Sequence, residues 1–365
     1  MPTLKVIISG GGTGGHIFPA IAIADEIKKR NPDADILFVG ADGRMEMTKV
    51  PEAGYPIKGL WISGIQRKLT LDNLSFPFKL MSSLWNANKI IKEFKPDIAI
   101  GVGGYASGPL LKRANARNVK TVLQEQNSFP GITNKWLARG ADKICVAYSN
   151  MERWFPKEKI SITGNPVRAL IADASVTKDQ AIAHFGLNSS KKTVLAIGGS
   201  LGARTINHAL RKHIEKITGD NIQVIWQCGK SFSSESERIS QNHTSGLVVT
   251  PFIKEMDMAY AAADVIISRA GAMSISELCL VGKPTILIPS PNVSEDHQTK
   301  NARALSDVNS AILLKDIDAE ENLYHVLNEL INDSSKMESM SQEIKKLAKP
   351  NATEDIVNQI EQLLK

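Results

Sequence analysis

A glycine-rich turn that follows a short apolar run occurs twice in this chain. Residues 6–16 read VIISGGGTGGH, and residues 194–204 read VLAIGGSLGAR. In the alignment of the two, Gly14 matches Gly202 and His16 matches Arg204. A strand that ends in such a turn and leads into a helix brings backbone N–H groups and the positive helix end together, which favours binding of an anion such as phosphate. Two copies predict two nucleotide-binding domains that face one cleft.

Short β-branched runs alternate with longer helical stretches along the whole chain, which is typical of βα units on parallel sheets. The runs lack polar alternation, as expected for strands that are covered on both faces. The predicted strands are 4–9, 36–39, 98–102, 121–124, 143–147 and 160–163 in the first half, and 193–197, 223–226, 247–249, 265–268, 285–288 and 311–314 in the second. The pattern therefore predicts an α/β protein with two doubly wound domains.

The turn-prone tripeptide at residues 164–166, Gly-Asn-Pro, is the expected domain boundary. It divides the chain into an N-terminal domain, residues 1–163, and a C-terminal domain, residues 164–350. Residues 351–365 have apolar side chains at helical spacing and predict a last helix with one apolar face. We expect this helix to join the N-terminal domain.

Composition limits the class of protein. The 365 residues suffice for two domains that each bury a core, and no apolar run approaches the ~20 residues that span a bilayer, so a cytoplasmic location is expected. The net charge of +6 fits ordinary surface lysines or an anionic partner, such as a nucleotide diphosphate or lipid headgroups. The chain has no dense block of Lys and Arg, so nucleic-acid binding is not expected. Cys145, Cys228 and Cys279 are scattered, which argues against a disulfide framework.

The first glycine turn permits more than one interpretation. Its glycines satisfy the G-x-G-x-x-G pattern of dinucleotide-binding folds, for which Asp42 would be the acidic partner, although it stands in a loop beyond Gly40. His16 is expected at the opening of the following helix. There it is either a general base, because imidazole has an ordinary pKa near ~6.5, or a local packing residue.

Seven motifs in order give the chain a resemblance to the MurG family of N-acetylglucosaminyltransferases over nearly its whole length. They are GGGTGGH (10–16), GVGGYASGP (101–109), EQNSFPGITN (125–134), GNPVR (164–168), GGSLGAR (198–204), SRAGAMSISEL (268–278) and EDHQTKNA (295–302). The resemblance implies the GT-B fold, in which two Rossmann-like domains enclose a cleft with the active site.

The activity that the resemblance implies is inverting transfer of GlcNAc from UDP-GlcNAc to the C4 hydroxyl of the muramyl residue of lipid I, which gives lipid II and UDP in peptidoglycan synthesis. No cofactor and no metal are expected, since backbone N–H groups of the second glycine loop and Arg168 could stabilise the leaving diphosphate. The implied location is peripheral, on the cytoplasmic side of the bacterial inner membrane, with other cell-wall synthesis proteins as further partners. The alternatives are a UDP-GlcNAc epimerase or another GT-B enzyme for UDP-sugars, an NAD(P)-dependent oxidoreductase, and a non-catalytic nucleotide-binding protein.

The resemblance also assigns donor-binding residues. Glu277 would accept both ribose hydroxyls, the backbone of Ile253 would meet uracil, and Gln298 would contact the sugar hydroxyls. Ser200 and Arg168 are expected at the diphosphate, although Arg168 is alternatively a surface or hinge charge. The full donor set is Thr13, Gly14, Gly15, Asn127, Arg168, Ser200, Ile253, Ala272, Met273, Ser274, Glu277 and Gln298.

The acceptor is expected on the N-terminal domain. Gly103, Gly104 and Tyr105 offer a second backbone turn for the acceptor diphosphate, and His16 is the expected general base, with Glu125 in reserve.

Residues 74–94 combine apolar side chains with basic ones and predict a helix that Pro77 could start. Such a segment can lie in the interface of an anionic membrane, with Phe76, Phe78 and Trp85 as the expected docking residues. Lys79, Lys89 and Lys92 on the segment, and Arg67 and Lys68 before it, are the basic residues. The alternative is that most of the segment packs on the sheet.

Overall fold

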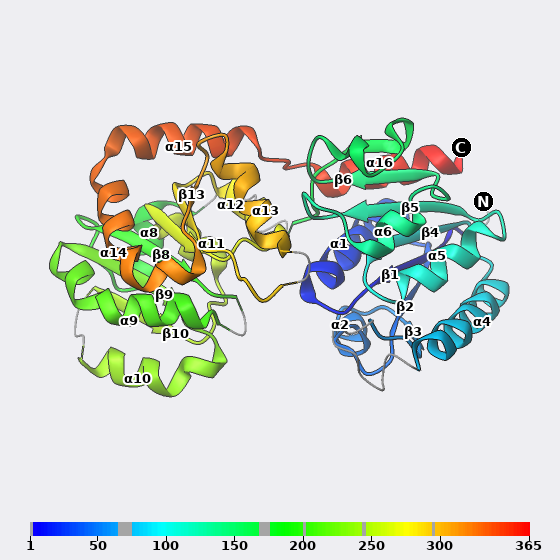
Figure 1. Ribbon diagram of the computed structural model, residues 1–365, viewed down its shortest axis with the longest axis horizontal. Helices are drawn as coiled ribbons and strands as arrows, with labels where there is room; N and C mark the ends of the chain where they lie inside the picture. The colour runs from blue at the N-terminus through cyan, green and yellow to red at the C-terminus, as the bar shows by residue number, and fades with distance from the viewer. Residues whose placement is uncertain (1–2, 65–74, 168–175, 200–201, 243–245, 294–295) are drawn as a thin grey trace. The chain divides into compact units, whose positions relative to one another are not determined.

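The structure, a computed structural model, describes residues 3–64, 75–167, 176–199, 202–242, 246–293 and 296–365. It divides into two compact units (Figure 1). Unit 1 comprises Met1–Val167 and Asn351–Lys365, and unit 2 comprises Arg168–Pro350. The chain therefore leaves unit 1 just after the Gly-Asn-Pro tripeptide and returns to it for the last helix.

Unit 1 contains a parallel sheet with the strand order β3-β2-β1-β4-β5-β6-β7. The strands are β1 (Lys5–Gly10), β2 (Asp35–Ala41), β3 (Ile57–Leu60), β4 (Ile98–Gly103), β5 (Lys120–Glu125), β6 (Lys143–Val146) and β7 (Ile160–Ile162). The six predicted strands are present, with ends shifted by one or two residues. The sequence analysis missed β3, because this edge strand is short and contains the exposed Lys58 next to Gly59.

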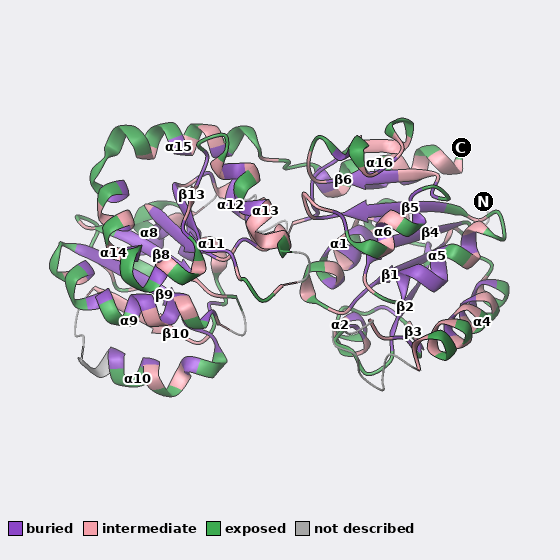
Figure 2. Cartoon of the chain, in the orientation of Figure 1, coloured by how far each residue is buried: buried purple, intermediate pink, exposed green. Residues whose placement is uncertain are grey.

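Side chains of successive residues in the strands of unit 1 enter two separate cores, one on each face of the sheet. Val6 and Ile8 pack with α1 (Gly14–Arg30), α2 (Glu46–Glu52) and the C-terminal helix α16 (Ala352–Leu364), whereas Ile7 packs with the helices of the other face. Those helices are α4 (Phe76–Phe94), α5 (Ser107–Asn115) and α6 (Ile132–Leu137). Figure 2 shows the strands as largely buried and the outer faces of the helices as exposed. Short 3-10 helices occupy Met151–Arg153 and Lys157–Lys159.

Unit 2 contains a six-stranded parallel sheet with the order β10-β9-β8-β11-β12-β13. The strands are β8 (Lys192–Ile197), β9 (Ile222–Gln227), β10 (Leu247–Thr250), β11 (Val265–Ser268), β12 (Thr285–Leu287) and β13 (Ile312–Leu313). The helices are α8 (Lys178–His184), α9 (Arg204–Gly219), α10 (Ser233–Asn242), α11 (Met256–Ala262), α12 (Ala272–Val281), α13 (His297–Ser306), α14 (Asp316–Asn332) and α15 (Ser334–Lys346), with a 3-10 turn at Lys230–Phe232. Trp226 is fully buried beside α9 and donates its indole N–H to Asn207 at 3.0 Å.

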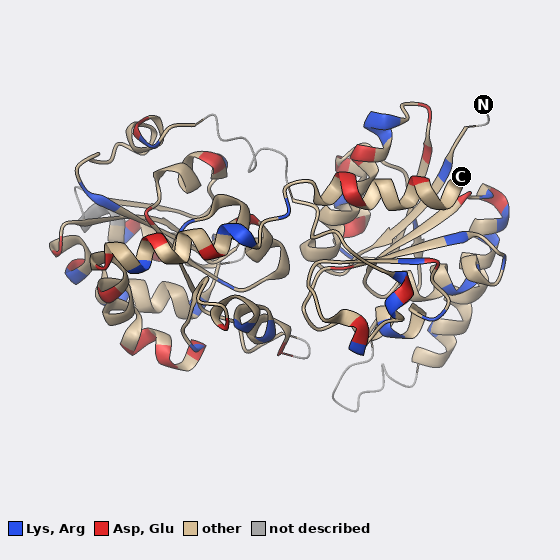
Figure 3. Ribbon diagram, turned by 90° about the horizontal axis from the view of Figure 1, so that it is seen from above, with Lys and Arg blue, Asp and Glu red and all other residues tan. Residues whose placement is uncertain are grey.

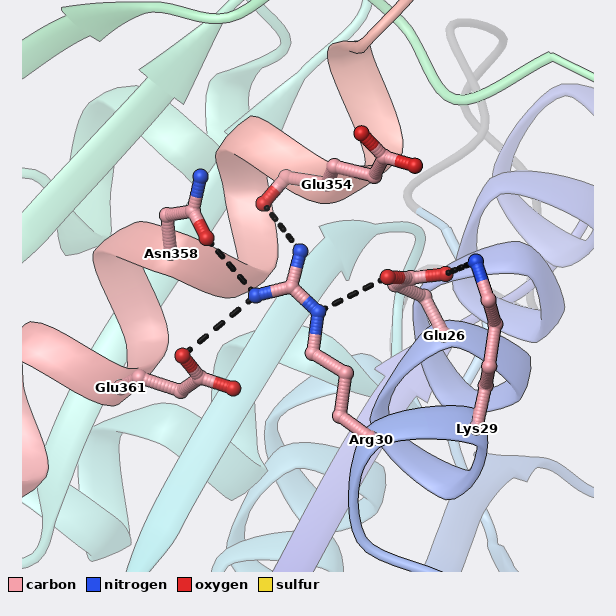
Figure 4. Close-up of polar contacts among 6 residues, drawn as sticks. All are labelled: Glu26, Lys29, Arg30, Glu354, Asn358 and Glu361. Atoms are coloured by element: carbon pink, nitrogen blue, oxygen red, sulfur yellow. Dashed lines mark hydrogen bonds and ion pairs between the residues drawn. The ribbon is translucent and has the colours of Figure 1, made fainter.

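The C-terminal helix α16 is held on unit 1 by apolar contacts and by one arginine. Ile356, Val357 and Ile360 are buried in the core that α1 also lines. At the end of α1, the Arg30 guanidinium donates to the Asn358 side chain at 2.7 Å and to the Glu354 carbonyl at 3.2 Å (Figure 4).

The same guanidinium forms ion pairs with Glu361 at 3.4 Å and with Glu26 at 2.8 Å. Burial opposes ionisation of Glu26, but the hydrogen bonds from Arg30 and Lys29 hold the pKa of this carboxyl below its ordinary value. Elsewhere, basic and acidic residues are interspersed on the helices of both units (Figure 3). No helix in the described part of the chain is long and apolar enough to cross a membrane.

Candidate functional site

The first glycine loop, residues 11–13, joins β1 to α1 and places His16 in the first turn of the helix. His16 Nδ1 lies 3.0 Å from the carbonyl oxygen of Gly11 and 3.4 Å from Oγ1 of Thr13. A carbonyl oxygen can only accept, so we assign the proton of the neutral imidazole to Nδ1. Nε2 is then the basic nitrogen of the ring, as a general base requires.

The turn between β4 and α5 packs directly on this loop. Gly103 and Gly104 have φ values of 102° and 94°, which favour glycine. A Cβ atom at Gly103 would lie 2.8 Å from Nε2 of His16, and one at Gly104 would lie 2.5 Å from the carbonyl oxygen of Gly11. The half-exposed ring of Tyr105 lies beside Gly12. The structure therefore brings the predicted acceptor residues together with the predicted base.

A buried carboxylate that the sequence analysis missed lies behind the first glycine loop. Glu46, at the start of α2, is 1% exposed. Its Oε2 accepts the N–H of Gly12 at 2.9 Å, and its Oε1 accepts the N–H of Ala41 at 3.0 Å. In the sequence, the only signal is an acidic residue that follows a predicted strand by a few positions.

Glu125 ends β5 and is 2% exposed. Its Oε1 accepts from the backbone N–H and the side chain of Asn127, and its Oε2 accepts from the Gly131 N–H and the Asn134 side chain. Burial raises the pKa of this carboxyl, and the four donated hydrogen bonds oppose the rise. These contacts orient the loop that carries Asn127. The sequence analysis did not single out Asn134.

The GNPVR motif adjoins the same loop of unit 1. Asn165 is 2% exposed, accepts from the Gln124 side chain at 2.9 Å and donates to the Gln126 carbonyl at 3.0 Å. The motifs GGGTGGH, GVGGYASGP and EQNSFPGITN thus lie at the carboxyl ends of β1, β4 and β5, which are neighbours in the sheet. Ligands of open α/β sheets bind at this edge.

The second glycine loop joins β8 to α9 in unit 2. The N–H of Gly202 donates to the carbonyl of Gly199 at 3.0 Å. In the first turn of α9, the Thr205 hydroxyl donates to Asp316 at 2.9 Å, and Arg269 forms an ion pair with the same carboxylate. The predicted diphosphate residues Ser200 and Arg168 lie outside the described residues.

Thr13, Gly14, Gly15 and Asn127 of the predicted donor set lie in unit 1, and the remaining described donor residues lie in unit 2. Glu277, on α12, accepts from the hydroxyl of the buried Tyr260 at 3.1 Å. Gln298, on α13, accepts the Ser290 N–H at 2.9 Å, which leaves its NH₂ group to act as the donor. Sequence reasoning gave no sign of Tyr260.

The N–H of Ile253 donates to the Gln227 side chain at 3.0 Å, so the Ile253 carbonyl is the backbone group suited to a ligand. Ala272, Met273 and Ser274 form the first turn of α12, whose first N–H groups lack partners within the helix. Such groups favour anionic or carbonyl oxygens. Sequence reasoning missed Gln227, which no motif marks.

The cysteines of the chain are unsuited to nucleophilic chemistry. All three thiols are buried. Burial raises the pKa of Cys145 and of Cys279 to about 12, and it raises the pKa of Cys228 as well. Because the thiolate is the reactive form, these side chains are inert at neutral pH.

Helix α4 carries an exposed apolar stripe. Phe78, Met81 and Trp85 are 69%, 70% and 66% exposed, and their spacing places them on one face of the helix. The exposed Lys89 and Lys92 continue this face toward the C-terminal end of the helix. The structure differs from the expectation at Phe76, which is partly buried and packs against the core of unit 1. Arg67 and Lys68 lie outside the described residues.

Residues 6–146 match the glycosyltransferase family 28 N-terminal domain, and residues 193–357 match the corresponding C-terminal domain. A UDP-N-acetylglucosamine--N-acetylmuramyl-(pentapeptide) pyrophosphoryl-undecaprenol N-acetylglucosamine transferase of Flavobacterium psychrophilum is 54% identical, over 100% of this chain and 99% of the relative.

Two solved structures resemble the chain over nearly its whole length. The crystal structure of Acinetobacter baumannii MurG is 27% identical with a TM-score of 0.80, and it covers 99% of this chain and 100% of its own. The crystal structure of a UDP-N-acetylglucosamine 2-epimerase is 15% identical with a TM-score of 0.65, over 99% of this chain and 96% of its own. At that identity the epimerase shows the fold alone.

Proposed function

The chain belongs to glycosyltransferase family 28, and we propose that it transfers GlcNAc from UDP-GlcNAc to the C4 hydroxyl of the muramyl residue of lipid I, giving lipid II and UDP. The observation that carries the proposal is the full-length similarity to the N-acetylglucosamine transferase of Flavobacterium psychrophilum. It is supported by a histidine whose basic Nε2 lies at the carboxyl edge of a Rossmann-like sheet. A UDP-GlcNAc epimerase is not favoured, because the epimerase similarity is at the level of the fold.

In this proposal unit 2 binds the donor. Glu277, oriented by Tyr260, accepts the two ribose hydroxyls, and the Ile253 carbonyl meets uracil. The Gln298 NH₂ group donates to the sugar hydroxyls, and the first turn of α12 supplies backbone N–H groups beside them. Ser200 and Arg168 are assigned to the diphosphate, where charge develops as the leaving group departs.

Unit 1 binds the acceptor and removes its proton. Nε2 of His16 takes the proton of the C4 hydroxyl while that oxygen forms a bond to C1 of GlcNAc and the bond from C1 to the diphosphate breaks, with inversion at C1. Gly103, Gly104 and Tyr105 position the acceptor diphosphate, with Thr13, Gly14 and Gly15 at the start of α1. Because four donors surround Glu125, its role is to orient Asn127 toward the donor sugar rather than to take the proton.

The acceptor is a lipid, so the proposal includes a membrane-docking surface on unit 1. The stripe of Phe78, Met81 and Trp85 supplies apolar side chains, and Lys89 and Lys92 supply charge for an anionic surface. The enzyme would then work peripherally at the cytoplasmic face of the bacterial inner membrane.

An assay of UDP release with and without a lipid I analogue tests the reaction. Release that requires the analogue, together with a product that contains the new β-1,4 bond, is expected. Isomerisation of UDP-GlcNAc without an acceptor would instead indicate an epimerase and would contradict the proposal.

Flotation with vesicles that contain anionic phospholipid tests the docking surface. Replacing Phe78, Met81 and Trp85 by Ser is expected to reduce binding at least about tenfold, because three exposed apolar side chains are lost. The matched control replaces Val308 and Ile317, which are exposed apolar residues of unit 2, and should bind as the wild type does. Equal flotation of all three proteins would place the membrane contact elsewhere.

A further inference from the structure

One peptide group of the first glycine loop contacts both His16 and Glu46. The carbonyl of Gly11 accepts from His16 Nδ1 at 3.0 Å, and the N–H of Gly12, in the same peptide unit, donates to Glu46 Oε2 at 2.9 Å. The three groups therefore form a continuous chain of hydrogen bonds from the imidazole to a buried carboxylate. The reaction described above assigns no role to this carboxylate.

We propose that Glu46 is a positioning residue that fixes the tautomer and basicity of His16 through the Gly11–Gly12 peptide. The His16 contact to a peptide carbonyl, with a carboxylate beyond it, resembles the outer contacts by which proteins orient functional histidines. Only the catalytic part of the inference rests on the proposed function. The effect of Glu46 on the His16 ring is a property of the protein without substrates.

The physical basis is polarisation of the peptide group. A negatively charged oxygen at the Gly12 N–H polarises the peptide group and makes the Gly11 carbonyl a stronger hydrogen-bond acceptor. Hydrogen bonds in such chains strengthen one another by about 10–30% per bond. A stronger acceptor favours the Nδ1–H tautomer of His16 and stabilises the imidazolium that forms when Nε2 takes a proton.

Neighbouring backbone groups bind the Glu46 carboxylate, and neighbouring glycines leave space for its side chain. Its second oxygen is fixed by the N–H of Ala41 at 3.0 Å, so the side chain is held at both oxygens. A Cβ atom at Gly11 would overlap Glu46 Oε1, and one at Gly40 would lie 2.5 Å from Glu46 Cγ. Both oxygens of Glu46 therefore accept from backbone N–H groups.

Other titratable groups lie on the elements packed against α1 and its loop. Tyr105 lies in the β4–α5 turn, and Glu125 ends β5, where its oxygens accept from the loop that follows it. On α16, Glu354 and Glu361 lie at the opposite end of α1, with Arg30. Glu46 is the carboxylate that is bonded to the peptide that His16 contacts.

The test substitutes Glu46→Gln, which keeps the volume but removes the charge and one acceptor. In the substrate-free protein with ¹⁵N-labelled histidine, NMR should show that the His16 tautomer population shifts away from Nδ1–H. In the transfer assay, kcat should fall about 10- to 100-fold with KM for UDP-GlcNAc within about twofold. The acid limb of the kcat–pH profile should move to lower pH, because loss of the Glu46 charge makes Nε2 of His16 less basic. A merely structural loss would lower kcat without moving that limb.

Asp97→Asn is the matched control. Asp97 also accepts a backbone N–H, from Lys5 at 2.8 Å, but it does so at the amino end of the same sheet. This variant should keep the wild-type tautomer, pH profile and kcat. A Glu46→Gln protein with the melting temperature, tautomer and kcat of the wild type would overturn the inference.

Two further outcomes are also decisive. If Glu46→Gln does not fold, the wild-type protein is tested instead: His16 must be the Nδ1–H tautomer, and the Gly12 amide proton must be shifted downfield and protected from exchange. Finding the Nε2–H tautomer would overturn the inference. If the transfer assay shows no lipid I activity, the proposed function fails, while the tautomer shift in the substrate-free protein still supports or overturns the role of Glu46.

Discussion

The two glycine-rich loops share a sequence pattern but differ in what holds them. In the first loop, the Gly12 N–H donates to the buried Glu46 carboxylate, and His16 follows in α1. In the second, the Gly202 N–H donates to the carbonyl of Gly199. The carboxylate bonded to the start of α9 in this unit, Asp316, is paired with Arg269.

In the proposed function, this difference lets one backbone motif serve two kinds of chemistry. Glu46 behind the first loop occupies the Gly12 N–H, whereas Asp316 beside the start of α9 is paired with Arg269. In the proposed function, the start of α9 is the helix end that would receive the donor diphosphate. The glycines alone therefore do not distinguish a phosphate loop from a proton-transfer loop. The residues that contact their N–H groups do.

The largest effect is expected for His16→Gln in the first loop. Loss of the general base should lower kcat about 10²- to 10⁴-fold, while the Kd for UDP-GlcNAc, measured by calorimetry, should stay within about twofold. His325→Gln, at an exposed histidine of unit 2, serves as the control. A fall in kcat of only about threefold or less would fit the loss of a contact and not the loss of a general base. Such a result for His16→Gln would remove the distinction between the loops.

Gly202→Ala tests the second loop. At φ 81°, a Cβ atom would overlap the carbonyl oxygen of Cys228, so the loop must move. Such strain costs about 1–3 kcal/mol, and the Kd for UDP should rise about 10- to 100-fold. The control is Gly219→Ala at the other end of α9, where an added Cβ meets nothing within 4 Å. Unchanged UDP affinity in Gly202→Ala would mean that this loop does not bind the diphosphate.

Tyr260→Phe sharpens the assignment of the donor to unit 2. Removal of one hydroxyl donor from Glu277 should raise the Kd for UDP about 3- to 10-fold, since a hydrogen bond to a charged group contributes roughly 1 kcal/mol or more. Tyr324→Phe removes a similar bond, to Asp220 at 2.6 Å in the same unit, and should leave UDP binding unchanged. Equal changes in the two variants would show that Glu277 is not oriented for ribose.

Arg30→Gln tests a feature of unit 1, the retention of its last helix. Because the lowered pKa of Glu26 belongs to the folded state, the pair stabilises unit 1 above the ordinary carboxyl pKa of 4.5, and this stabilisation is lost as the pH falls through the lowered value. We expect a loss of about 1 kcal/mol at pH 7, visible as faster hydrogen exchange in α16, and a smaller difference from wild type below pH ~4. Lys29→Gln, at a more exposed partner of Glu26, should have less effect. A pH-independent difference would contradict this account.

The sequence predicted most of the fold because its signals are local. Short β-branched runs that alternate with helical stretches identified the strands, and the predicted GT-B fold of two Rossmann-like domains is confirmed. Strand β3 was missed because its signal depends on the neighbouring β2 rather than on its own four residues. Phe76 was assigned to the surface because the sequence does not fix which face of the first turn of α4 meets the sheet.

The site could be predicted only in part. His16 and Glu277 lie in recognisable motifs, so the sequence analysis singled them out. Glu46 and Tyr260 were not singled out, because each makes its hydrogen bond to a site residue across 34 and 17 residues of chain, in a contact that only the fold creates. Their sequence neighbourhoods contain no spacing that would mark a partner.

The central claim, that the first loop removes the proton and the second binds the donor diphosphate, is tested most directly by a double-mutant cycle on kcat/KM for UDP-GlcNAc with His16→Gln, Gly202→Ala and the double variant. The account predicts that the two losses of activation free energy add within about 0.5 kcal/mol, with the His16 loss in kcat and the Gly202 loss in KM. A coupling above about 1 kcal/mol, with the double variant no worse than His16→Gln alone, would show that the loops act as one unit and would contradict the claim.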